Sequence, residues 1–228
     1  MDIKLHYIEK GKGFPLILLH GNGESIEYFE HQIDYFARSY RVIAIDTRGH
    51  GKTPRGEREF SLKQFAEDLK EFLDSKRILR AILLGFSDGG NIAMLFALKY
   101  QSYVEALILN GANVHTGGVR KTYQIPICIG YGMVSFLAVF SKSMVQKKEM
   151  LGLMVTQPNI ALAELEKITV WVLVIAGKKD MITYEHTRAI HNHLPKSEMV
   201  ILEGDHFIAN KNPEAFNKEV EKFLEQVH

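Results

Sequence analysis

Three residues in this chain have the types and the positions needed for covalent attack on a carbonyl group. Ser87 stands in the pattern G-x-S-x-G of residues 85–89, between an apolar run and a predicted helix. Glycines on both sides permit the strained turn that leaves a serine hydroxyl free to react. The alternative is a glycine-rich turn without chemistry. The strand–turn–helix setting favours a nucleophile at Ser87.

A serine hydroxyl is a weak nucleophile and needs a base, which in turn needs a carboxylate to orient it. His206 follows the last predicted strand, and Asp180 follows the apolar run that ends near Gly177. Two other carboxylates could compete for the orienting role. Asp205 adjoins His206 and has poor geometry for it, whereas Asp46 is expected to hold its own loop. We therefore predict the chain order Ser87, Asp180, His206.

Two backbone N–H groups are expected to stabilise the oxyanion formed by that attack. One belongs to Asp88, the residue after the nucleophile, and the other to Asn22 in the glycine-rich segment 20–23. The Asp88 carboxylate has two further readings. It either attracts a substrate ammonium or simply lies at a helix N-terminus, where the helix dipole favours it.

Short apolar runs alternate with amphipathic helices along most of the chain, which predicts a parallel sheet covered on both faces. The predicted strands are residues 3–9, 15–19, 41–45, 81–84, 104–109, 169–176 and 199–202. Predicted helices begin at Ser25 and Ser61 and span 91–100 and 213–227. Every polar, glycine-rich cluster follows a strand, and functional groups gather at that edge of such sheets.

Residues 113–160 interrupt this rhythm and separate residues 1–112 from residues 161–228. They contain an uncharged segment, 124–140, with basic residues on both sides. Because this segment holds one proline and two glycines, we expect a buried or pocket-covering segment rather than a membrane span. We assign four residues to an apolar substrate pocket: Phe86, Met133, Phe136 and Phe207.

Composition is that of an ordinary globular protein, with 46% apolar and 24% charged residues among 228. The net charge of +1 gives no reason to expect nucleic acid as a partner, and no stable membrane insertion is expected. The single cysteine, Cys128, cannot form an internal disulfide. The first residues show no secretory signal, so we expect a cytoplasmic location. The oligomeric state is left open.

The motifs together resemble the α/β-hydrolase superfamily over residues 3–227. The segments that match are residues 20–23, 46–51, 85–90, 177–180 and 204–206. Ser-Asp-Gly-Gly at 87–90, with Gly-Ala-Asn at 111–113, further resembles the biphenyl-hydrolase-like esterases. Serine at position 87 argues against the haloalkane dehalogenases and epoxide hydrolases, whose similar motif carries an aspartate nucleophile.

This resemblance implies an α/β fold, with a mostly parallel twisted sheet and helices on both faces. It further implies that residues 113–160 form a small helical cap on a core made of residues 1–112 and 161–228. It also implies a serine hydrolase of the carboxylesterase kind, cleaving a small to medium apolar ester through an acyl-enzyme. No metal or organic cofactor is expected. The same triad could act on C–C, thioester or lactone bonds, and a ligand-binding signal receptor of this fold stays open.

Overall fold

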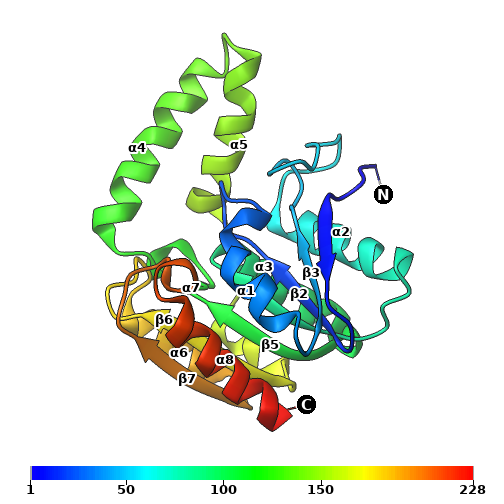
Figure 1. The fold of residues 1–228 in the computed structure, drawn as a ribbon. Helices are drawn as coiled ribbons and strands as arrows, with labels where there is room; N and C mark the ends of the chain where they lie inside the picture. The colour runs from blue at the N-terminus through cyan, green and yellow to red at the C-terminus, as the bar shows by residue number, and fades with distance from the viewer. Residues whose placement is uncertain (1, 228) are drawn as a thin grey trace.

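The computed structural model describes residues 2–227 and contains a seven-stranded sheet (Figure 1). The strands lie in the order β1-β3-β2-β4-β5-β6-β7. Their bounds are β1 Tyr7–Lys10, β2 Pro15–Leu19, β3 Arg41–Ile45, β4 Ala81–Phe86, β5 Val104–Asn110, β6 Trp171–Gly177 and β7 Ser197–Leu202. Strand β1 pairs antiparallel with β3, and every other pairing is parallel. All seven predicted strands are confirmed.

The central strands are apolar on both faces because helices cover both faces of the sheet. In β2, Ile17 and Leu19 belong to one hydrophobic cluster, whereas Leu16 and Leu18 belong to another on the opposite face. The first cluster includes residues from α2 (Leu62–Ser75), α3 (Asp88–Tyr100) and α6 (Tyr184–His193). The second includes residues from the helices α1 (Glu30–Phe36), α7 (Ile208–Lys211) and α8 (Pro213–Val227).

Two of the predicted helix starts carry the side-chain caps that their sequences suggested. The Ser61 hydroxyl accepts a hydrogen bond from the Gln64 N–H and caps α2. The Ser25 hydroxyl accepts from the Glu27 N–H and caps a 3₁₀ helix, η1 (Ile26–Phe29), which leads into α1. Three further 3₁₀ helices are η2 (Gln101–Tyr103), η3 (Thr116–Gly118) and η4 (Leu162–Lys167).

Helices α4 (Lys121–Leu137) and α5 (Lys142–Thr156) form an antiparallel pair that stands away from the sheet (Figure 1). Both lie inside the segment predicted as a cap, and we call residues 121–156 the two-helix arm. Residues 124–140 were expected to be either buried or pocket-covering. Burial is wrong, since no residue of α4 is buried, whereas the covering role stays a prediction. The helix packs mainly on α5 and not on the sheet. Within residues 2–227, no helix is long and apolar enough to cross a membrane.

Candidate active site

Ser87 occupies a sharp turn between the end of β4 and the start of α3. Its backbone has φ 52° and ψ −118°, a conformation that side-chain-bearing residues rarely adopt. The flanking glycines make the turn possible. A Cβ on Gly89 would lie 1.9 Å from the Leu19 carbonyl oxygen, and one on Gly85 would lie 2.3 Å from the Gly89 backbone. This close approach explains in physical terms why the pattern G-x-S-x-G requires glycine.

His206 and Asp180 form a buried hydrogen-bonded pair at the same edge of the sheet. The His206 Nδ1 lies 2.7 Å from the Asp180 Oδ1, and the two side chains are 6% and 2% exposed. Asp180 Oδ1 also accepts from the Ile182 N–H at 2.8 Å, which fixes the carboxylate. When Nδ1 donates to Asp180, the other ring nitrogen, Nε2, carries a lone pair that can take a proton.

Contacts through β5 bring this pair to the turn that carries Ser87. The Ser87 N–H donates to the Asn110 carbonyl at 2.8 Å, and the next residue, Gly111, lies against the pair. A Cβ on Gly111 would lie 2.8 Å from the His206 ring and 3.2 Å from Asp180 Oδ2. The Phe86 ring lies 4.8 Å from the His206 ring, centroid to centroid. Ser87, Asp180 and His206 thus follow the carboxyl ends of β4, β6 and β7, and Gly111 after β5 lies between them.

The two predicted oxyanion donors lie on either side of Ser87. Asp88 is the first residue of α3, so its N–H has no carbonyl partner within the helix. Asn22 lies in a tight turn closed by the hydrogen bond from the Glu24 N–H to the Gly21 carbonyl. A Cβ on Gly21 would lie 3.2 Å from the Ser87 Cβ, so this turn runs directly past Ser87.

His20 fixes the turn that contains Asn22, a role that was not predicted from the sequence. Its Nε2 accepts the Thr47 N–H at 3.0 Å, so its Nδ1 carries the proton and donates to the Gly21 carbonyl at 2.7 Å. Burial, with His50 nearby, lowers the pKa of His20 to about 4. The neutral ring therefore fixes the direction of the Gly21 carbonyl at neutral pH.

The Asp88 side chain is buried in a network of amide groups. Its two oxygens accept from Asn22 Nδ2 and Asn91 Nδ2, each at 3.1 Å, and Asn91 also bonds Asn113. Burial raises the pKa of Asp88 to about 6, although both amides act in the opposite direction. The Asn91–Asn113 pair was not predicted. Asn91 is the polar residue within the apolar stretch 89–98 of α3, and this position could have indicated a buried polar contact.

The two carboxylates that could compete with Asp180 for His206 bind other groups instead. Asp46 accepts hydrogen bonds from the Ile26 and Lys52 N–H groups and therefore holds its own loop. Asp205 accepts the Phe207 N–H at 2.9 Å and pairs with Lys211. Neither carboxylate is the partner of the His206 Nδ1.

A small cavity of about 30 Å³ lies beside Ser87. Its wall includes Asn22, Asp88 and Asn113 from the core, together with Gln124 and Met154 from the two-helix arm. Val119, Gln157, Met181 and Ile182 complete it, and sequence reasoning had assigned none of these four to the site. Drug-sized ligands occupy pockets about ten times larger, so a substrate must displace side chains or the arm.

The structure separates the four residues predicted to line the substrate pocket. Phe86 is 1% exposed and stacks on Tyr28, with ring centroids 4.1 Å apart, so it supports the site from beneath. Met133 and Phe136 are 62% and 67% exposed on α4, and neither lines the cavity beside Ser87. These two assignments are corrected, because α4 carries both residues outward from the core.

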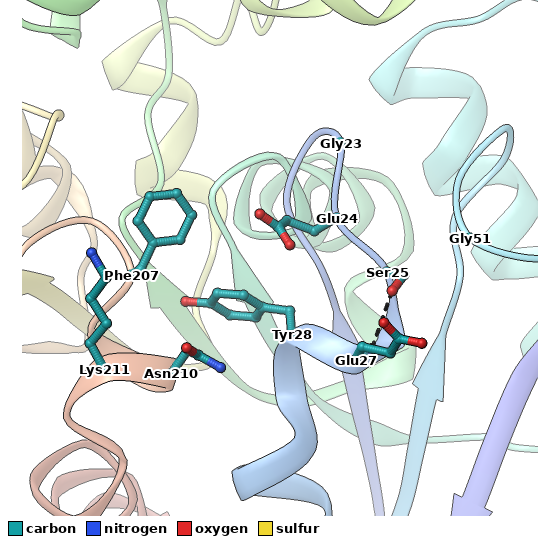
Figure 2. A pocket seen from close by; sticks show the side chains of 9 residues that line it. All are labelled: Gly23, Glu24, Ser25, Glu27, Tyr28, Gly51, Phe207, Asn210 and Lys211. Carbon is teal, nitrogen blue, oxygen red and sulfur yellow. Dashed lines mark hydrogen bonds between the residues drawn. The ribbon is translucent and has the colours of Figure 1, made fainter.

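Phe207 instead lines a larger open hollow of about 670 Å³ next to the site (Figure 2). Figure 2 shows Glu24 and Tyr28 on one side of this hollow and Phe207, Asn210 and Lys211 on the other. None of the three predicted catalytic residues lines it. Across residues 2–227 there is also no cluster of three or more histidine, cysteine or acidic side chains able to hold a metal ion.

Comparison with known proteins agrees with this architecture. The family model described as alpha/beta hydrolase fold matches residues 15–126. The chain is 28% identical to the serine hydrolase BPHL of Homo sapiens, over 98% of this chain and 84% of that protein. It is 27% identical to 3-oxoadipate enol-lactonase 2 of Acinetobacter baylyi, over 99% of this chain and 94% of the relative.

A solved bromoperoxidase from Bacillus anthracis has the same fold, with a TM-score of 0.84 at 22% identity over 98% of this chain and 96% of the other. The sequence matches, the seven-stranded sheet and its order define one class of protein. This chain has the α/β-hydrolase fold.

Proposed function

We propose that this protein is a serine hydrolase that cleaves a small to medium, largely apolar carboxylic ester through an acyl-enzyme. Ser87 attacks the carbonyl carbon, while His206 Nε2 takes the hydroxyl proton and returns it to the leaving alcohol. Asp180 orients the ring and stabilises its charged form. Water then attacks the acyl-enzyme with His206 as base, which releases the acid and restores Ser87.

The hydrogen bond between His206 and Asp180 carries this proposal. Its length of 2.7 Å, in a buried setting, fixes the ring with Nε2 free to act as base beside the strained Ser87 turn. The N–H groups of Asn22 and Asp88 would stabilise the oxyanion. Removing one such donor typically costs about 3–4 kcal/mol of transition-state stabilisation. The resemblance to biphenyl-hydrolase-like esterases supports the same assignment.

A fluorophosphonate probe tests the proposed nucleophile. We expect one probe per chain on Ser87, located by peptide mass spectrometry, and loss of labelling in both Ser87→Ala and His206→Ala. Steady turnover of a panel of p-nitrophenyl esters should disappear in the same two variants. Thr53→Ala, which removes a buried hydroxyl in a loop outside the triad, is a suitable control.

Labelling at another residue, or equal labelling in His206→Ala, would overturn the assignment. Ligand binding with at most one turnover per site would instead indicate a receptor of this fold.

One observation supports a second candidate, hydrolysis of a lactone. A relative matched over almost the whole chain is named an enol-lactonase. A lactone is a cyclic ester, so the same residues would act and the leaving alcohol would stay attached to the acyl group. Comparing kcat/KM for acyclic esters and for lactones of matched carbon number decides between the two. A preference of a hundredfold or more for lactones would replace the ester proposal.

A further inference from the structure

The outer face of α4 carries a continuous apolar stripe. Ile125, Ile129, Met133 and Phe136 are spaced by four, four and three residues, which places them on one side of the helix. Their exposed fractions rise along the helix from 56% to 67%. The stripe continues into the turn at the end of the arm, where Val139 and Phe140 are each 76% exposed.

Such a stripe is unusual on the surface of a globular protein, because large exposed apolar patches generally mark an interaction site. The stripe lies on the part of the molecule that projects furthest from the sheet (Figure 1). The end of the arm is aromatic, since the Phe136 and Phe140 rings contact each other edge to face.

The charges of the arm are almost all positive. Residues 121–156 contain four lysines and a single acidic residue, Glu149. Glu149 is already paired with Arg55 of the core. The lysines flank the apolar stripe: Lys121 begins α4, Lys142 begins α5, and Lys147 lies one turn further along. Apolar side chains between exposed lysines are typical of segments that bind the interface of an anionic bilayer.

The same charges argue against a second copy of the chain as the occupant. A symmetric contact between two arms would bring the lysines of one arm against those of the other, without free acidic partners in either. A protein partner would need a groove that matches the projecting end of the arm, whereas a lipid layer deforms around it.

We infer that the two-helix arm docks this protein on an anionic lipid surface. Val139, Phe140 and the outer stripe of α4 would enter the boundary between headgroups and acyl chains. Lys142 and Lys147 would contact the phosphate groups. The contact is peripheral, since α4 is too short to span a bilayer. It goes beyond the proposed ester hydrolysis and does not depend on it.

Vesicle flotation tests this inference with the full chain. We expect it to float with vesicles of phosphatidylcholine and phosphatidylglycerol, and much less with phosphatidylcholine alone. Added sodium chloride should weaken the binding, because salt screens the lysines. Val139→Ser/Phe140→Ser and Lys142→Gln/Lys147→Gln should each reduce the partition coefficient by about tenfold or more.

Matched controls test whether the arm itself, rather than any exposed apolar or basic side chain, causes the binding to vesicles. Leu79→Ser changes a side chain that is 79% exposed on the core, and Lys12→Gln/Lys63→Gln removes two exposed lysines elsewhere. Both should float like the wild type, and circular dichroism melts check that every variant is folded. Absence of flotation, or equal flotation of arm and control variants, would overturn the inference. So would a wild-type dimer that Val139→Ser/Phe140→Ser dissociates, because the stripe would then be a contact between copies.

Discussion

Asn22 connects three parts of the molecule through one side chain. Its Nδ2 donates to Asp88 Oδ2 at 3.1 Å and to the Met150 carbonyl of α5 at 2.8 Å. Its backbone N–H is the proposed oxyanion donor. The side chain therefore couples the position of that donor to the carboxylate beside Ser87 and to the two-helix arm.

Asn22→Ala keeps the backbone donor and removes both side-chain bonds. We expect kcat for a p-nitrophenyl ester to fall about tenfold, less than the loss of a donor itself. The pH profile should also shift, because losing one hydrogen bond raises the pKa of Asp88 further above about 6. Asn159→Ala is the matched control, since this exposed amide donates to the Thr156 carbonyl and does not line the cavity beside Ser87. An unchanged pH profile in Asn22→Ala would refute the coupling.

Two buried histidines make the fold sensitive to acid. Burial and nearby His50 lower the pKa of His20 to about 4, and burial beside His115 lowers that of His186 to about 4. Between about pH 6.5 and 4 the unfolded chain binds protons that the native state does not. The free energy of unfolding therefore falls as the pH drops through this window. Asp88 opposes it, because its raised pKa lets the native state bind a proton first.

His186→Gln should reduce this sensitivity. The His186 Nε2 accepts the Val114 N–H at 3.1 Å, and a glutamine oxygen can accept the same bond. We expect the loss of Tm between pH 7 and pH 5 to be smaller than in the wild type by about 3 °C. His31→Gln alters an exposed histidine and serves as the control. An equal loss of Tm between pH 7 and pH 5 in His186→Gln and the wild type would contradict the assignment of acid sensitivity to His186.

At the scale of elements, α5 is the helix that holds the arm to the core. Besides the Asn22–Met150 bond, Gln146 Nε2 donates to the Gly49 carbonyl at 2.9 Å, and Arg55 pairs with both oxygens of Glu149. Helix α4 contributes no buried residue. The position of the whole arm therefore depends on α5, through these polar contacts and through Leu153, which is buried in the core with Met150 packed nearby.

Glu149→Gln weakens the pair with Arg55 and should loosen the arm. We expect limited proteolysis within residues 121–156 to become several-fold faster, while the global Tm changes little, because a partly exposed pair contributes only about 1 kcal/mol. Glu166→Gln, at an exposed site on η4, provides the comparison. If cleavage is no faster, or if it falls in the core instead, this ion pair does not hold the arm.

The strands of this fold could be predicted because continuous apolar runs report burial on both faces directly. The predicted ends of strands and helices were less accurate. Strand β1 begins at Tyr7 rather than at residue 3, and helix α3 begins at Asp88 rather than at residue 91. The order Ser87, Asp180, His206 was readable because each residue follows a strand. The exposure of α4 could not be predicted, because an apolar helix of this composition can be buried or exposed and only its contacts decide. The amides Asn91 and Asn113 were missed because partners distant in sequence define their roles.

At the scale of the whole molecule, a buried ionic cluster joins the N-terminal segment to the sheet and to α2. Arg48 is fully buried and donates two hydrogen bonds to Asp68, each 2.7 Å, and further bonds to Asp2. These carboxylates raise the pKa of Arg48 despite its burial. Removing one partner of such a group leaves a charge without compensation.

Asp68→Asn should therefore lower the free energy of unfolding by about 3–5 kcal/mol. Urea denaturation measures this as a lower midpoint with an unchanged slope. Asp34→Asn breaks the exposed pair with Lys10 and should cost less than about 1 kcal/mol. Similar losses in the two variants would show that Arg48 does not need Asp68 for its charge to be tolerated.

The single thiol of the chain, Cys128, lies on α4 and therefore on the two-helix arm. Cys128 is exposed near the middle of α4, and no other cysteine occurs in the sequence. A maleimide fluorophore or a nitroxide attached there would report on the arm alone, without any engineered site. The emission wavelength of the fluorophore, or its accessibility to quenchers, would report movement of the arm when an ester or vesicles are added. The protein thus carries a natural attachment point for following the two-helix arm in solution.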